Sequence, residues 1–354
     1  MLNLFTRKAK PREVAPQLTL TERRSLQPAG VPPAGLPYAV YDQMQTDAMV
    51  QTALTVKRLG VVAAPYRLVP NGASPAHVAF VQEAFNRMEG SPLTILQGAM
   101  DAFAKGWSIQ ELVFEPIGAQ VFLAAVRPKD PAMFGLDVDA FGRIQQVKLQ
   151  LPGESALELP RSKFILFQNR SGYGSVKGRS DLDAAYRHWQ AKQSLLAAWK
   201  LELERFAMPT VLAQYARGLP ADEQASLLSS LDNLHRITSI LYPDEIEIKT
   251  LGGDKEVSVG FMDAIDFHNR EIARSILGQT LTTDEGRRVG SLAMGRVHLQ
   301  VLLLQLESLR RELADRVMTE QVIRPLIELN FGNVPIPRFE FESNAADSFI
   351  TGKV

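Results

Sequence analysis

A long amphipathic segment constrains the fold more than any other feature of this sequence. Over residues 286–324, leucine and valine side chains recur at spacings of three and four. They are Leu302, Leu306, Leu309, Leu313 and Val317. That spacing places them on one face of an α-helix. Such a helix would span roughly 55 Å at about 1.5 Å per residue, well beyond an average helix of roughly 11–12 residues. It therefore needs a long surface to lie on, either in its own chain or in a second copy.

Composition predicts a folded, soluble, cytoplasmic protein without cysteine chemistry. The 354 residues include 39 Lys and Arg against 39 Asp and Glu, and 45% of them are apolar. The zero formal net charge argues against a generally polybasic nucleic-acid-binding protein. Because Cys is absent, disulfides, thiolate zinc sites and cysteine nucleophiles are excluded. No run of about 18 apolar residues occurs, so we expect no membrane partner and no membrane span.

The first half of the chain predicts an arm followed by an α+β block. Residues 1–37 hold many prolines, six basic residues and two acidic ones, which is typical of a flexible or partner-bound arm. Apolar periodicity predicts helices over 38–64, 75–89 and 92–105, and YRLVP at 66–70 predicts a short strand after Pro65. Segments rich in β-branched and aromatic residues then continue to Asn169 and predict an antiparallel sheet. The expected fold class is therefore α+β.

The second half predicts long helices separated by short strands. A helix over 181–207 is capped by Ser180 or Asp181 and stopped by Pro209. The further elements expected are a strand at 210–215, a helix at 221–235, a strand at 246–251 and a helix at 261–278. Gly278 follows the last of these helices as a terminating glycine.

The residues that carry chemistry do not form a recognisable active site. The five histidines are His77, His188, His235, His268 and His298, and none has the spacing of a metal-binding motif. Asp263, Asp266 and Glu271 share one helix, where a solvated face is the ordinary interpretation. We therefore expect no catalytic residues, no metal site and no cofactor.

The loop over residues 172–180, GYGSVKGRS, resembles a phosphate-binding loop at first sight. However, Lys177 precedes Gly178, and Arg179 stands where that motif has its lysine. A flexible connector before a capped helix is the favoured interpretation. Nucleotide binding by this loop is the alternative.

Several longer segments together resemble the portal proteins of Mu-like tailed bacteriophages and prophages. ILGQTLTT at 276–283, within the polar stretch that continues to residue 291, is the most specific of them. The others are YDQMQTDAMVQTALTVKRLGVVAAPYRL at 41–68, AFAKGWSIQELVFEP at 102–116, GYGSVKGRSDLDAAYRHWQAK at 172–192 and WKLELERFAMPTVLAQY at 199–215. The resemblance covers about residues 40–330, and it implies a buried Glu in the strand within 102–116.

The chain also departs from that family in two places. Phe206-Ala207-Met208-Pro209 replaces the usual Phe-Gly-x-Pro, and the sequence stops soon after Asn330. The second departure leads us to expect a reduced or absent C-terminal crown.

The resemblance implies a subunit of a ring of about twelve copies at one capsid vertex of a virion assembled in the host bacterial cytoplasm. Such a ring nucleates head assembly, docks the terminase large subunit, conducts double-stranded DNA, and contacts the major capsid or scaffold protein and the neck or head-completion protein. The implied parts follow the arm at 1–37. They are an α+β wing at 38–180, a stem helix at 181–208, a small α/β clip at 209–258, a second stem helix at 259–278, a tunnel loop at 279–290, a long wing helix at 291–340 and a tail at 341–354.

Within this scheme the candidate site residues are structural and DNA-facing rather than catalytic. The candidate DNA-channel residues are Arg270, Arg274, Asp284, Glu285, Arg287 and Arg288. Pro209 and Gly260 mark the stem–clip junction. The tunnel-loop motif is Gly278, Gln279, Thr280, Leu281, Thr282 and Thr283. The charged residues could equally pair across subunit interfaces. The competing functional hypotheses are another structural adaptor of the phage head or neck, and an enzyme that uses the 172–180 loop.

Overall fold

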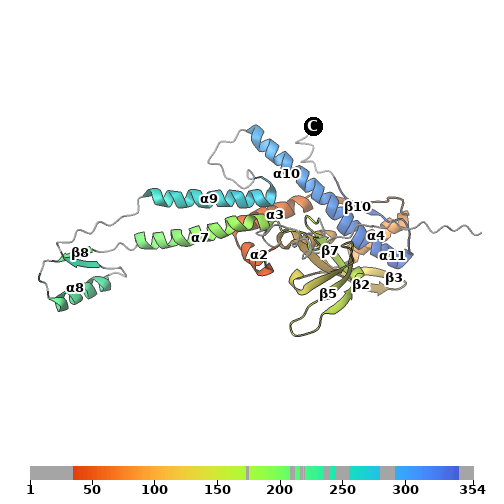
Figure 1. Ribbon diagram of the computed structural model, residues 1–354. Coiled ribbons are helices and arrows are strands. Elements are labelled where there is room, and N and C mark those ends of the chain that lie inside the picture. The colour runs from red at the N-terminus through yellow and green to blue at the C-terminus, as the bar shows by residue number, and fades with distance from the viewer. Residues whose placement is uncertain are drawn as a thin grey trace, which may run out of the picture. The chain divides into compact units, whose positions relative to one another are not determined.

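The computed structural model describes residues 35–172, 175–207, 212–215, 218, 220–234, 240–243, 255–279 and 292–342. These residues form helices and mainly antiparallel strands, which confirms the expected α+β class (Figure 1). The chain divides into two compact units: unit 1 contains residues 1–185 and 273–354, and unit 2 contains residues 186–272. Two long helices, α7 (Leu182–Ala207) and α9 (Lys255–Leu277), contribute residues to both units.

Five helices open the described part of unit 1. They are α2 (Tyr38–Met44), α3 (Ala48–Val62), α4 (Pro75–Arg87), α5 (Pro92–Ala99) and α6 (Ala102–Lys105). Side-chain caps begin three of them, α3, α4 and α5. The Asp47 side chain accepts hydrogen bonds from the backbone N–H groups of Met49 and Val50 and so starts α3. The single helix expected over 38–64 is therefore two helices. The helix expected over 92–105 is likewise divided into α5 and α6.

The expected antiparallel sheet is confirmed, as two three-stranded sheets. The first contains β2 (Trp107–Ile117), β3 (Gln120–Lys129) and β7 (Phe164–Gln168) in the order β3-β2-β7. The second contains β4 (Phe134–Val138), β5 (Ile144–Leu149) and β6 (Leu157–Pro160) in the order β4-β5-β6. Side chains from both sheets share one apolar core, formed by Trp107, Ile109, Phe134, Val147, Phe164 and Leu166.

The resemblance implies a buried glutamate in β2, and this expectation is wrong. Glu111 is half-exposed, and its carboxylate lies 2.9 Å from the Lys129 ammonium. The neighbouring Gln110 is the buried residue, and its Nε2 donates to the carbonyl of Ile95 at 2.9 Å. A neutral amide with a backbone partner can be buried at much lower cost than an ionised carboxylate.

The long amphipathic helix is confirmed, and it continues beyond the apolar pattern of 286–324 to Phe331. It comprises α10 (Leu292–Leu313), the segment η3 (Ala314–Ile323) and α11 (Arg324–Phe331). The residues expected to begin it, 286–291, lie outside the described residues. Four of the five stripe residues, Leu302, Leu306, Leu313 and Val317, are buried.

The segment η3 is a π-helix, a form that rarely exceeds a single turn. Gln321 lies within it and contacts strand β7: its Nε2 donates to the Leu166 carbonyl, and its Oε1 accepts from the Leu166 N–H, both at 2.9 Å. The same Nε2 also donates to the carbonyl of Arg316. Thr319 accepts the N–H of Phe339 at 3.1 Å. The π-helix thus presents polar side chains to two separate strands.

The short strand expected at 66–70 is confirmed as β1, but its pairing into a two-stranded ribbon in unit 1 was not expected. Strand β1 (Tyr66–Val69) pairs antiparallel with β10 (Arg338–Phe341), with Tyr66 opposite Phe341. The Tyr66 and Phe339 rings stack at 4.6 Å. The domain boundary placed between residues 340 and 341 therefore falls inside a strand, and the expected wing helix at 291–340 ends at Phe331.

Unit 2 contains all of α7 after its first turn, strand β8 (Leu212–Tyr215), helix α8 (Ala221–Leu234), strand β9 (Ile240–Pro243) and most of α9. The strands β8 and β9 are parallel, with Leu212 opposite Ile240. The strand expected at 210–215 and the helix expected at 221–235 are confirmed. The other expected strand, 246–251, lies outside the described residues, and β9 precedes it in the chain.

Candidate functional site: a buried polar cluster and the ends of α7 and α9

A fully buried carboxylate lies just before the first residue of α7. The Asp181 side chain is 0% exposed, and its Oδ2 lies 2.5 Å from Nζ of Lys57 on α3. Its Oδ1 accepts from Nδ2 of Asn169 at 3.0 Å and lies 3.3 Å from a guanidinium nitrogen of Arg170. Burial lowers the pKa of Lys57, and the Asp181 charge opposes that shift. Lys57, Asn169 and Asp181 form the buried polar cluster, and the exposed Arg170 side chain lies at its edge.

The backbone around the cluster is closely interlocked. Asn169 N–H donates to the Gly106 carbonyl and Arg179 N–H donates to the Asn169 carbonyl, each at 2.8 Å. Gly178 has φ +63°, and a Cβ atom built there would lie 2.4 Å from the carbonyl oxygens of both Asn169 and Gly106. Only glycine fits such a position without a rearrangement of the backbone. The cluster therefore joins α3, the 106–107 turn and the start of α7 into one rigid element.

The loop at 172–180 does not form a phosphate-binding site in its described residues. The N–H groups of Ser175, Gly178 and Arg179 already donate to carbonyl oxygens of the chain. Lys177 lies 5.5 Å from the Trp107 ring, and burial lowers its pKa. Phosphate loops need free N–H groups that converge on an anion. Tyr173 and Gly174 lie outside the described residues.

The amino end of α7 is occupied by acidic groups. Ser180 Oγ accepts the N–H of Leu182 at 2.9 Å and so provides the cap. In the first turn, Asp183 accepts a 2.5 Å hydrogen bond from the Tyr41 hydroxyl, and burial raises the pKa of this carboxyl group. Together with Asp181, these carboxyl groups make the helix end unfavourable for a nucleotide phosphate. The connector interpretation of the 172–180 loop is favoured over nucleotide binding.

The tunnel-loop motif begins inside unit 1. Gly278 has φ +72°, and its N–H donates to the Arg274 carbonyl at 2.9 Å, which ends α9. Gln279 is only 2% exposed, so it belongs to the core of unit 1. The later candidate residues, Thr280, Leu281, Thr282, Thr283, Asp284, Glu285, Arg287 and Arg288, lie outside the described residues.

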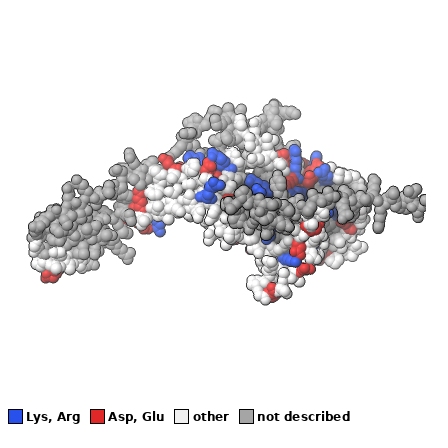
Figure 2. Space-filling view, in the orientation of Figure 1, with Lys and Arg blue, Asp and Glu red and all other residues white. Residues whose placement is uncertain are grey.

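The other candidate residues are separated along the chain. Arg270 is half-buried and Arg274 is exposed, and both interact with other groups of the protein. Gly260 lies inside α9, because the helix begins at Lys255 rather than near residue 259. Pro209 lies outside the described residues. Figure 2 shows Lys and Arg side chains interspersed with Asp and Glu over the described part of the visible face.

A histidine pair in unit 2 was missed by sequence reasoning. His188 on α7 and His268 on α9 lie 80 positions apart, and their Nδ1 atoms are 3.2 Å apart. The ring of Phe267 meets both imidazoles edge to face. This contact shows that α7 and α9 pack side by side in unit 2. No local motif could have revealed it, because each histidine alone has the pattern of an ordinary helix residue.

The histidine pair should make unit 2 less stable in acid. Burial and the neighbouring His188 lower the pKa of His268, whereas Glu271 opposes that shift. The unfolded chain then binds more protons than the folded one as the pH falls below about 6.5, so the free energy of unfolding decreases there. Denaturant titrations at pH values from about 7 to about 5 should show this decrease. His268→Asn should flatten the profile, and an equally steep decrease in that variant would contradict the assignment.

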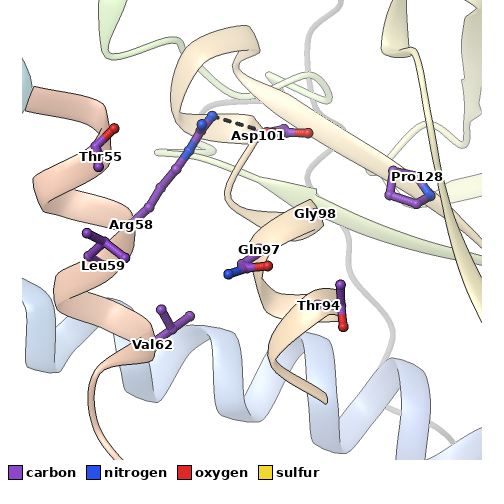
Figure 3. Close-up of a pocket in the computed structure, with 9 residues that line it drawn as sticks. All are labelled: Thr55, Arg58, Leu59, Val62, Thr94, Gln97, Gly98, Asp101 and Pro128. Carbon is purple, nitrogen blue, oxygen red and sulfur yellow. Dashed lines mark hydrogen bonds and ion pairs between the residues drawn. The ribbon is translucent and has the colours of Figure 1, made fainter. Parts of the chain in front are cut away.

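A shallow cavity of about 420 Å³ lies between α3 and α5. Arg58 extends from α3 across its opening to Asp101, with 3.1 Å between the guanidinium and the carboxylate (Figure 3). Thr94 and Gln97 line the α5 side. Burial raises the pKa of Asp101, against the effect of Arg58. The cation and the carboxylate neutralise each other, so this cavity has no unpaired charge of the kind that general acid–base catalysis uses.

Within the described residues, no three His, Asp or Glu side chains come close enough to share a metal ion. None of the described helices has both the length and the apolar character needed to cross a bilayer.

The fold is that of phage portal proteins. A chain of the virion of a native gene transfer agent particle superposes with a TM-score of 0.61, at 12% identity, over 95% of this chain and 92% of that one. A chain from the neck of the native particle, computed with C12 symmetry, superposes with a TM-score of 0.57 at 14% identity. The superposition covers 89% of this chain and 86% of that one. An HK97 family portal protein from Corynebacterium diphtheriae superposes with a TM-score of 0.50 at 12% identity. The superposition covers 85% of this chain and 94% of that one.

The family is established by sequence. The model of the family described as portal protein of Mu bacteriophage matches residues 38–349. This chain therefore belongs to that family, and the resemblance noted in the sequence is confirmed.

Two curated relatives are similar along most of this chain. The portal protein of Escherichia phage Mu is 24% identical over 300 residues, which are 82% of this chain and 56% of the relative. The Mu-like prophage FluMu protein gp29 of Haemophilus influenzae is 24% identical over 324 residues, which are 88% of this chain and 61% of the relative. The chain thus spans little more than half the length of these relatives.

Proposed function

We propose that this chain is the portal subunit of a tailed phage or prophage, and that about twelve copies form a ring at one vertex of the capsid. The observation that carries the proposal is the family match over residues 38–349 of a chain with the portal fold. The C12 symmetry named for one solved neighbour supports a ring of that size. The ring would nucleate head assembly and conduct double-stranded DNA during packaging and ejection.

The described structure is consistent with a structural rather than a catalytic role. Unit 1 would form the wing, and the paired helices α7 and α9 would form the stem. Residues after Gln279, with Arg270 and Arg274, would line or approach the channel. A conduit must let DNA slide, and each additional phosphate contact would add salt-dependent affinity. A formal net charge of zero suits that requirement.

The partners follow from the role. At the capsid vertex the ring would contact the major capsid or scaffold protein, the terminase large subunit during packaging, and a neck or head-completion protein afterwards. Assembly would take place in the cytoplasm of the host bacterium. We propose no cofactor and no catalytic residue.

Mass photometry and negative-stain microscopy of the purified full-length protein test the proposal. One chain has a mass of 39.2 kDa, so a closed ring of about twelve copies should have a mass of about 470 kDa and a central hole. Titration over a range of protein concentrations controls for slow or incomplete closure. A chain that stays monomeric or dimeric at every concentration, also with its own scaffold or capsid protein present, would contradict the proposal.

A further inference from the structure

Helix α10 has two apolar faces, and the described residues of the subunit cover one of them. Leu302 and Leu306 point inward and are buried, and Leu306 fills the space beside Gly60 of α3. On the other side, three side chains follow one another at helical spacing. They are Val297, Val301 and Leu304, with exposed fractions of 57%, 42% and 72%. We call these three residues the outer face of α10.

The outer face lies in a segment without charge. Residues 297–306 read VHLQVLLLQL and contain no Asp, Glu, Lys or Arg. Surface helices of globular proteins ordinarily carry charged residues on the side opposite the core. Arg296 and Glu307 flank this uncharged segment on α10, and a row of exposed aliphatic side chains between them is typical of a surface that contacts another protein. Double-stranded DNA would find no cation in this segment for its phosphates.

A second copy of this chain is the partner that fits the outer face. In a ring with rotational symmetry, each subunit presents one surface to the next subunit and a different surface to the previous one. An apolar face left open in one copy is then covered by a surface of its neighbour. The C12 symmetry named for a solved neighbour of the same fold is consistent with such contacts.

We infer that the outer face of α10 is buried against a neighbouring copy of this chain when the ring closes. This inference rests on the proposed function and adds the surface through which neighbouring subunits meet. Apolar burial would hold the copies together at this contact, and salt should weaken that part of it little because the three side chains carry no charge.

The first test is Leu304→Glu in the full-length protein. The side chain is exposed in the single subunit, so the variant should fold normally. In the ring it would place a carboxylate in an apolar contact, and the concentration needed for assembly should rise at least about tenfold. Leu157→Glu is the matched control, because Leu157 on β6 is 55% exposed and undergoes the same change. That variant should form rings like the wild type.

The second test uses the absence of native cysteine. Leu304→Cys and Leu157→Cys each introduce a single thiol, and the rate of maleimide labelling reports whether each site is covered. In assembled rings Leu304→Cys should react at least about tenfold more slowly than Leu157→Cys, whereas in dissociated subunits both should react rapidly. Thermal unfolding monitored by circular dichroism shows whether each variant is folded.

The outcomes of these tests distinguish a wrong assignment of the surface from a failure of the portal proposal. If the wild type forms rings and Leu304→Glu forms them equally well, the assigned surface is wrong and the portal proposal stands. If the wild type never forms rings, the portal proposal itself fails. Slow labelling of Leu304→Cys in isolated subunits would show that the chain's own segments cover the outer face, which would also overturn the inference.

Discussion

Asp181→Asn is expected to destabilise unit 1 by about 3–5 kcal/mol, because it leaves a buried ammonium without its counter-charge. Lys57 is almost fully buried, and its Nζ lies 2.5 Å from the Asp181 carboxylate. An amide at position 181 keeps the shape but removes the charge. Denaturant unfolding followed by tryptophan fluorescence measures the change, since Trp107 lies in the core of this unit.

Two further variants show whether charge is the cause. Lys57→Met combined with Asp181→Asn removes the stranded cation and should recover part of the lost stability. Arg170→Ala should cost less than about 1 kcal/mol, because the Arg170 side chain is 56% exposed and its charge is screened by solvent. A loss below about 1 kcal/mol in Asp181→Asn itself would show that the ion pair does not stabilise the fold.

Gly178→Ala is expected to be far more damaging than the same change at Gly172, the other described glycine of the 172–180 loop, where nothing lies within 4 Å of a built Cβ atom. The backbone at Gly178 has φ +63°, and the new Cβ would lie 2.4 Å from two carbonyl oxygens. Both oxygens belong to the hydrogen-bonded backbone around the buried polar cluster, so neither can move freely. We expect a loss of more than about 4 kcal/mol or a failure to fold.

Comparison with Gly118→Ala separates two causes of the lost stability: the steric clash of the new Cβ atom and the left-handed backbone conformation. Gly118 has a similar φ of +61°, but nothing lies within 4 Å of a Cβ atom built there. This variant should lose only the roughly 1–2 kcal/mol that a left-handed backbone costs an ordinary residue. Denaturant midpoints of the two variants measure the difference. Equal losses in both would mean that the close approach to Asn169 and Gly106 is relieved by a small backbone shift.

Local sequence signals predicted the elements that depend on local physics. The helices α4, α7 and α8 agree closely with their expected ranges, because caps, prolines and apolar spacing act within a few residues. The break between α2 and α3 was missed, because apolar periodicity continues through Gln45–Asp47 while the Asp47 cap restarts the helix. The π-helix was also missed, because its polar contacts depend on strands distant in the sequence.

In the candidate site, too, the local feature was predicted and the contacts between distant segments were not. The helix cap before α7 was predicted as Ser180 or Asp181, and the structure assigns it to Ser180. Asp181 has a different role, as the partner of Lys57, which is 124 positions away. The His188–His268 contact likewise joins two helices that are separate in sequence. Partners that meet only through the tertiary fold leave no trace in a single sequence.

The β1–β10 ribbon also determines when a subunit can be completed during synthesis. Arg67 and Glu340 face each other across it, although they are 273 positions apart. While the ribosome is still producing the intervening chain, β1 has an unpaired edge, which is prone to non-specific pairing. Unit 1 can close only after the segment through Phe341 has been made. Chains that end before Arg338 would therefore lack the β1–β10 pairing, and unit 1 of such chains should be less stable.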